Sequence, residues 1–232
     1  MKRNLAIRVF AVAIPLLSMT AVMAETAIQP PLTARGNEPG WIMTVEAGQM
    51  SFTPVDGEKM VSGVPEPQGV DGGGARFIGE GMSLTLSPAI CHDTMTGMPY
   101  PLTAKVEAAN NLYDGCAGLP SDLLAGGQWN VVQITDTMMA EPMKIFIAFD
   151  SANKTVSGSS GCNNFAGEFD LTGEGMTFGQ AMAGTTMACD EPVTTLERSF
   201  LDTMSKVTGF DIGSNGELLL KVNTTTVIQA VR

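Results

Sequence analysis

Short stretches of alternating apolar and polar residues make up most of the first half of the chain. Alternation with a period of two is typical of β-strands that bury one face. The pattern predicts strands at 41–47, 50–55, 75–80, 82–90 and 101–108. Turn clusters rich in Gly, Asn and Asp separate these stretches, so we expect an antiparallel β-domain here.

The second half combines the same alternation with one helical pattern. Strands are predicted at 129–134, 144–150, 154–159, 168–172, 209–212, 217–222 and 225–231. Between them, Leu196, Phe200, Met204 and Val207 recur at spacings of four, four and three, which is typical of the buried face of a helix. Asp190 is placed to cap this helix, and Pro192 suits its first turn.

Together these patterns predict an α+β fold that is mainly antiparallel β. We expect two small domains, of which the C-terminal one is a curved sheet packed on one helix. The predicted boundaries are a signal peptide at 1–24, a Pro-rich tether at 25–39, an N-terminal β-rich domain at 40–119, a linker at 120–126 and a C-terminal domain at 127–232.

The start of the chain has the layout of a cleavable export signal. Basic residues precede an apolar run, and small residues follow it, which predicts cleavage after Ala24. The alternative is a membrane anchor, but the uncharged run covers only residues 9–24, and a spanning helix needs about 20 residues. No Cys follows the run before Cys91, so a lipid anchor is not indicated. We expect a soluble periplasmic protein with no membrane span after cleavage.

The charge of the chain argues against two classes of partner. The full sequence has a formal net charge of −11, and removal of residues 1–24 takes away three basic residues and no acidic ones. Such a chain repels nucleic acid and anionic membrane surfaces. No run of acidic residues reaches three, so the acidic side chains are expected to form a solvated surface.

Two sequence motifs in the second half resemble the META domain of HslJ-like bacterial envelope proteins. The first is GCN-x-F-x-G and the second is T-x-MAC; their residues are Gly161, Cys162, Asn163, Phe165, Gly167, Thr185, Met187, Ala188 and Cys189. The chain departs from the family at Thr186, where Arg is common. The first half, with NEPGW at 37–41 and CHDTMTGMPYP at 91–101, resembles an uncharacterised envelope domain often joined to META domains.

This resemblance implies a protein of the envelope-stress or heat-shock response. It also implies a fold similar to that of pilotin lipoproteins, and it transfers no catalytic residues. We therefore expect a non-catalytic envelope-stress or envelope-maintenance binding module that acts on an envelope protein, a peptide or a lipid.

Four cysteines in an exported chain favour disulfide bonds. Pairing within each predicted domain joins Cys91 to Cys116 and Cys162 to Cys189. Two alternatives are a zinc site and a reactive thiol. Zinc would need unusual ligand spacing, because there is no Cys-x-x-Cys pair and His92 is the only histidine. A reactive thiol would need a base, and the second half has no His.

The N-terminal half contains a second candidate function. Cys91, His92, Met95 and Met98 form C-H-x-x-M-x-x-M, a set of soft ligands that suits Cu(I). The competing interpretation is a structured turn whose Met residues fill a core and whose Cys forms a disulfide. The alternative function is therefore a periplasmic copper-binding protein; the leading prediction has no cofactor and no metal.

Sequence motifs of the common enzyme classes are missing, and a hydrolase ranks third. The Asp190-Glu191 pair is explained by its place at a helix start. For the C-terminal domain two hypotheses concern ligand binding. Either its apolar side chains line a groove for an apolar chain, or they fill the core and partners bind the loop at 135–143. The groove candidates are Trp129, Val131, Ile145, Ile147, Phe165, Phe178, Leu218–Leu220, Phe200 and Met204, and the loop candidates are Met138, Met139 and Met143.

Overall fold

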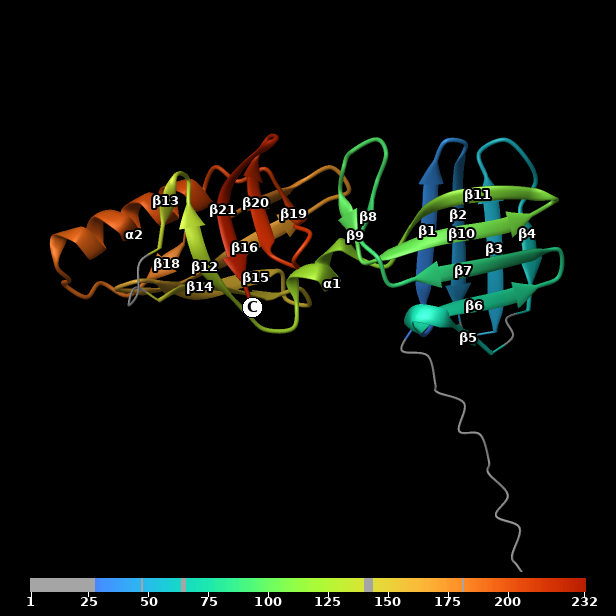
Figure 1. Ribbon diagram of the computed structural model, residues 1–232, viewed down its shortest axis with the longest axis horizontal. Helices are drawn as coiled ribbons and strands as arrows, with labels where there is room; N and C mark the ends of the chain where they lie inside the picture. Colours follow the sequence, from blue (N-terminus) through green and yellow to red (C-terminus); the bar gives the residue numbers. More distant parts are fainter. Residues whose placement is uncertain (1–27, 47, 64–65, 140–143, 181) are drawn as a thin grey trace, which may run out of the picture.

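The computed structural model describes residues 28–46, 48–63, 66–139, 144–180 and 182–232 (Figure 1). Each half forms one large curled antiparallel sheet around its own core, and the two halves lie side by side along the long axis. The predicted α+β, mainly antiparallel class is confirmed. The predicted signal peptide at 1–24 lies outside the described residues. No helix in the described part of the chain is long and apolar enough to cross a membrane.

The N-terminal half contains a nine-stranded sheet in the order β4-β3-β2-β1-β11-β10-β7-β6-β5. Its elements, with the separate hairpin β8–β9, are β1 (Leu32–Asn37), β2 (Gly40–Glu46), β3 (Gln49–Pro54), β4 (Met60–Ser62), β5 (Gln68–Val70), a 3-10 turn (Asp71–Gly73), β6 (Gly74–Gly79), β7 (Met82–Ser87), β8 (Cys91–His92), β9 (Pro99–Tyr100), β10 (Leu102–Ala108) and β11 (Asn111–Ala117). Strands β1 to β3 cross over β6, β7 and β10, as Figure 1 shows, and enclose a core that includes Trp41, Phe52 and Phe77.

The C-terminal half contains a ten-stranded sheet, ordered β17-β16-β15-β14-β12-β21-β20-β19 with β13 beside β12 and β18 beside β16. Its elements are α1 (Pro120–Leu124), β12 (Gln128–Ile134), β13 (Thr137–Met138), β14 (Ile145–Asp150), β15 (Thr155–Ser160), β16 (Asn164–Leu171), β17 (Met176–Phe178), β18 (Ala183–Gly184), α2 (Glu191–Met204), β19 (Gly209–Ile212), β20 (Leu218–Val222) and β21 (Thr225–Val231). The Met176 amide donates to the Thr208 carbonyl at 3.0 Å, so the sheet curls until its two ends nearly meet.

Helix α2 covers the interior of this curled sheet with the apolar face that the sequence predicts. Phe200 and Met204 are fully buried, and the Phe200 ring lies 5.6 Å from that of Phe165 on β16. Asp190 occupies the N-cap position, but its side chain makes no capping hydrogen bond, so the predicted cap is wrong. The start of α2 is instead fixed by the disulfide at Cys189 and by Thr194, whose hydroxyl donates to the Cys189 carbonyl.

The groove candidates are core residues. All of them are buried except Leu219, and they belong to one cluster packed between the sheet and α2. Burial of apolar side chains against one another leaves no free surface for an apolar chain among them. The core interpretation therefore holds, and the groove hypothesis is wrong for these residues.

Part of the predicted tether is a strand. Residues 32–37 form β1, which pairs with β2 on one side and β11 on the other, and Ala34 is fully buried. The Pro-rich composition of 25–39 concealed the alternation within LTARGN. The predicted linker at 120–126 is also structured: α1 begins at Pro120, and Leu124 is fully buried.

The connection between the halves is held by Trp129 on β12 and by Arg232, which follows β21. The Trp129 indole donates to the Leu124 carbonyl at 3.0 Å, and the Arg232 guanidinium stacks on the Trp129 ring at 4.0 Å from its centre. Arg232 also donates to the carbonyls of Leu123, Leu124 and Ala125 at the end of α1. Burial lowers the pKa of Arg232.

Candidate functional site

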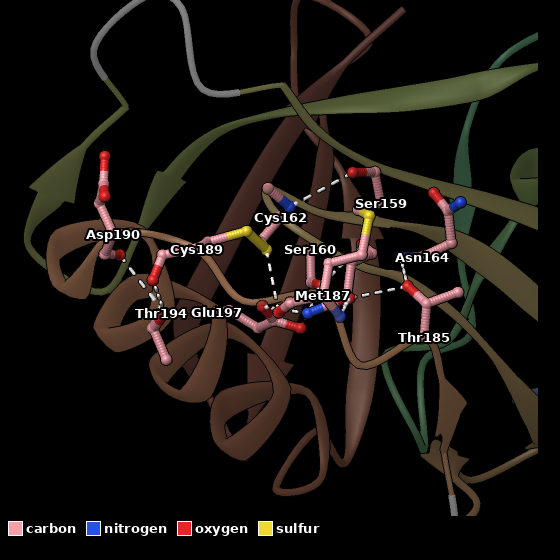
Figure 2. Close-up of a disulfide and its surroundings, with 12 residues drawn as sticks. Ser159, Ser160, Cys162, Asn164, Thr185, Met187, Cys189, Asp190, Thr194 and Glu197 are labelled. Atoms are coloured by element: carbon pink, nitrogen blue, oxygen red, sulfur yellow. Dashed lines mark hydrogen bonds between the residues drawn. A yellow bond between two sulfur atoms is a disulfide. The ribbon is translucent and has the colours of Figure 1, made fainter.

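Several predicted motif residues lie close together around one disulfide; Figure 2 shows Cys162, Thr185, Met187 and Cys189. The turn between β15 and β16 carries Gly161 and Cys162, and Cys162 is joined to Cys189 just before α2. Gly161 has a φ of +107°, a conformation that favours glycine. Because the bridge ties this turn to the start of α2, it closes the sheet against its helix.

Asn163 connects the turn to the segment that precedes α2. Its side-chain oxygen accepts hydrogen bonds from the Thr185 hydroxyl at 2.8 Å and from the Met187 amide at 2.7 Å. Its side-chain nitrogen donates to Glu197 on α2 at 3.1 Å. The side chain is buried, so each of these bonds satisfies a group that would otherwise be costly to bury.

Ser160 and Glu197 complete this polar cluster, and neither was among the site residues predicted from the sequence. The Ser160 hydroxyl lies 2.9 Å from the Asn163 carbonyl and 2.9 Å from a carboxylate oxygen of Glu197 (Figure 2). One signal was present: Glu197 comes three residues before Phe200, which places it beside the apolar face of α2. We call Ser160, Asn163, Thr185 and Glu197, with the Cys162–Cys189 bridge, the motif cluster.

The remaining motif residues take either packing or surface positions. Phe165 is buried against Phe200. Gly167 lies so close to Met182 that a Cβ atom would approach the sulfur to 3.3 Å. Met187 is 59% exposed, and Thr186, at the position where Arg is common in the family, is exposed as well.

The methionines predicted to contact a partner differ in their exposure. Met138 on β13 is 66% exposed, whereas Met139 is partly buried and packs against the C-terminal core, so Met138 is the better placed of the two for a surface contact. Met143 lies outside the described residues.

Strands β13 and β18 both lie at the end of the C-terminal half remote from the N-terminal half (Figure 1). We call residues 137–138 and 183–189 the distal end.

The motif cluster has the chemistry of a structural support. Ser160 is fully buried and its neighbours are an amide and a carboxylate. The only histidine, His92, belongs to the other half. A serine nucleophile needs both a base and access to a substrate carbonyl, and Ser160 is closed off from solvent. The arrangement instead fixes the backbone on which Thr186 and Met187 are exposed.

The soft-ligand constellation does not converge. Cys91 is bonded to Cys116, and Met98 is buried in the same cluster as the C-terminal core. The His92 ring donates to or accepts from Asp211 on β19 at 2.8 Å, and Met95 is 77% exposed at the tip of the hairpin. The structure therefore gives the copper hypothesis no shared site. With all four cysteines in disulfides, the zinc and reactive-thiol alternatives for them are wrong as well.

These residues instead form the junction between the halves. Hairpin β8–β9 belongs to the N-terminal half, but Met98 and Tyr100 pack into the C-terminal core. Asp211 also accepts a hydrogen bond from Lys221 at 2.7 Å. Burial raises the pKa of Asp211, but the hydrogen bonds from Lys221, His92 and the Ile212 amide outweigh burial, so the net pKa is lowered.

Asp93 organises the hairpin turn. It accepts hydrogen bonds from the Met95 and Thr96 amides at 2.9 Å each, and from Asn37 at 2.9 Å. Burial raises the pKa of Asp93, but these bonds and that of the Thr96 hydroxyl lower it by more. The hairpin is thus fastened to the N-terminal half by Asn37 and the Cys91–Cys116 bridge, and to the C-terminal half by apolar packing and His92.

Comparison with known proteins places the C-terminal half in a family. The META domain model matches residues 122–232, which confirms the resemblance of this half; the resemblance of the N-terminal half to an envelope domain stays a prediction. META domains are not a known enzyme family. An NMR structure of a protein from Burkholderia xenovorans aligns with 24% identity over 48% of this chain and 85% of that chain, with a TM-score of 0.39. No curated protein matches the chain.

Proposed function

We propose that the protein is a non-catalytic binding module of the bacterial envelope that acts in envelope stress or maintenance and holds its partner at the distal end. The observation that carries this proposal is the exposure of Met138 and Met187 at the end of the META domain where the motif cluster fixes the chain. The partner is an envelope protein or peptide with an apolar surface. We place the protein in the periplasm.

The physical argument combines an adaptable contact with a fixed support. Met side chains are unbranched and polarizable, so they fit partners of different shape. The segment that carries Met187 is held by the hydrogen bond that the Met187 backbone N–H donates to the Asn163 side chain, and by the Cys162–Cys189 bridge. A backbone that is already ordered loses little entropy on binding, which favours affinity.

The compartment is supported by the covalent structure. Two disulfides persist in oxidising surroundings such as the periplasm and are rare in the cytosol. The predicted signal at 1–24 agrees with this placement. The direct test is the N-terminus of the protein purified from a periplasmic fraction, which should be Glu25.

The test of binding uses crosslinking in the periplasm of heat-stressed cells followed by identification of captured proteins. We expect the Met138→Ser/Met187→Ser variant to lose the specific partner that the wild type captures. The matched control is Met95→Ser, which removes a still more exposed Met, at 77%, from hairpin β8–β9 and should keep capture. Equal capture by the double variant, with unchanged thermal unfolding, would show that the distal end is not the binding surface.

A further inference from the structure

A cleft at the junction combines positive charge with apolar walls. It measures about 250 Å³, and both halves contribute to it. Its cationic residues are Arg35 on β1 and Lys154 in the turn before β15; Ser121 and Ser151 supply hydroxyl groups. Tyr100 and Phe169, both almost fully buried, supply aromatic wall.

The charge of this cleft is unusual for the chain. The sequence has 24 Asp and Glu against 13 Lys and Arg, yet the cleft is lined by two cations and no carboxylate. Four other surface hollows of the described residues each include at least one carboxylate. A local excess of one charge in a concave site raises the concentration of ligands of opposite sign.

Arg35 is available to such a ligand. Its guanidinium lies over the Tyr100 ring, 5.8 Å from the ring centre, and within the described residues it forms no ion pair with a carboxylate. A guanidinium beside an aromatic face keeps its in-plane N–H groups free to bind a carboxylate with two parallel hydrogen bonds.

Lys154 can assist. It pairs with Asp170 at 3.0 Å, but the two side chains are 68% and 58% exposed, and exposed pairs of this kind contribute little. Its ammonium can therefore bind a second anionic oxygen without the loss of an important contact.

From these observations we propose that the junction cleft binds a small organic carboxylate with an apolar body, of the size of benzoate or hexanoate. The carboxylate binds Arg35, with Lys154 beside it, and the apolar body lies against Tyr100 and Leu171. The size of the cleft suits ligands of this length rather than a long acyl chain. This site is separate from the distal end, so it goes beyond the proposed function.

The test is a titration of the full mature chain with benzoate and hexanoate, followed by NMR chemical shifts and by calorimetry. We expect saturable binding with shifts confined to the cleft. Arg35→Gln should weaken binding about tenfold and Lys154→Gln about threefold, as expected for loss of charge-assisted hydrogen bonds. Lys206→Gln is the matched control, because Lys206, just after α2, is also an exposed lysine paired with an aspartate.

Benzamide and hexanamide separate charge recognition from apolar packing. They have nearly the same shape without the charge and should bind at least tenfold more weakly. Binding of the amides as tight as that of the acids, or unchanged binding by Arg35→Gln, would overturn the proposal, as would the absence of binding by the wild type. The same variants should keep partner capture at the distal end, so failure here is distinct from failure there.

Discussion

The two disulfides close loops of nearly equal length but lie in different surroundings. Cys91–Cys116 spans 25 residues and Cys162–Cys189 spans 27, so the chain-entropy model assigns about 3.5 kcal/mol to each. The first bridge holds a hairpin whose side chains enter the core of the other half. The second joins a partly buried turn to the start of α2 within one half. Removal of the first bridge should therefore destabilise both halves, whereas removal of the second should destabilise the C-terminal half alone.

The strongest test of this comparison removes each bridge as a Cys→Ser pair. Cys91→Ser/Cys116→Ser should lower the free energy of unfolding by about 3.5 kcal/mol and affect both halves, because the hairpin also fills the C-terminal core. Cys162→Ser/Cys189→Ser should cost a similar amount in the C-terminal half alone. Denaturant unfolding followed by tryptophan fluorescence measures both, since Trp41 and Trp129 report on one half each.

Variants that retain a single tryptophan, Trp41→Phe or Trp129→Phe, separate the two signals. If removal of the Cys91–Cys116 bridge shifted only the Trp41 transition, the hairpin would not couple the halves. If removal of the Cys162–Cys189 bridge shifted the Trp41 transition as well, the halves would unfold as one unit for another reason.

Asn163→Ala should be the next largest effect. It removes three side-chain hydrogen bonds. The Met187 amide loses its bond to Asn163, and Glu197 keeps only its bond from Ser160, at a cost of about 2–3 kcal/mol in the C-terminal half. The neighbouring Asn164→Ala is the control, because Asn164 is exposed and uses its backbone for its bonds with Thr185. It should change stability by less than about 0.5 kcal/mol. Equal effects in thermal unfolding would remove Asn163 from its central role.

Asp211→Asn tests the polar contact across the junction. At neutral pH we expect a loss of about 1 kcal/mol, because two charge-assisted hydrogen bonds weaken. The folded-state pKa of Asp211 is lowered below its usual 3.8, so its carboxylate contributes stability above about pH 4 and loses it as the pH falls through the folded pKa. Stability measured between pH 2 and pH 6 should thus fall less steeply in Asp211→Asn than in the wild type. If stability fell with pH equally steeply in the two proteins, Asp211 would not be the source of this acid sensitivity.

The smallest effect is expected at Asp190. Because the Asp190 side chain makes no capping bond, Asp190→Asn should lower the free energy of unfolding by about 0.5 kcal/mol or less. This loss corresponds to the interaction of the carboxylate with the helix dipole. Thr194→Val, which removes the hydroxyl bond to the Cys189 carbonyl, should cost more. Calorimetric melting temperatures compare the two. A larger loss at Asp190 would restore the cap that the sequence suggests.

The sequence by itself determined the features that depend on local pattern. Period-two alternation identified most of the longer strands, and the spacing of Leu196, Phe200, Met204 and Val207 identified α2 and its buried face. Turn chemistry placed the turn after β10 correctly, since Ala109 and Asn110 have positive φ, but the strand that follows it, β11, was not predicted. Cysteine parity and the division into halves predicted both disulfide pairs.

The tertiary structure alone decided which distant residues meet. The two-residue strands β8, β9, β13 and β18 carry too few residues to show a period, and β1 is hidden in a Pro-rich stretch. Glu197 became part of the motif cluster only when α2 packed on β15, and Met98 became core only when its hairpin reached the other half. Arg35 and Lys154 lie 119 positions apart in the chain and share a cleft because the halves adjoin. Periodicity records the side on which a residue is buried, whereas its partner depends on how the sheets curl and dock.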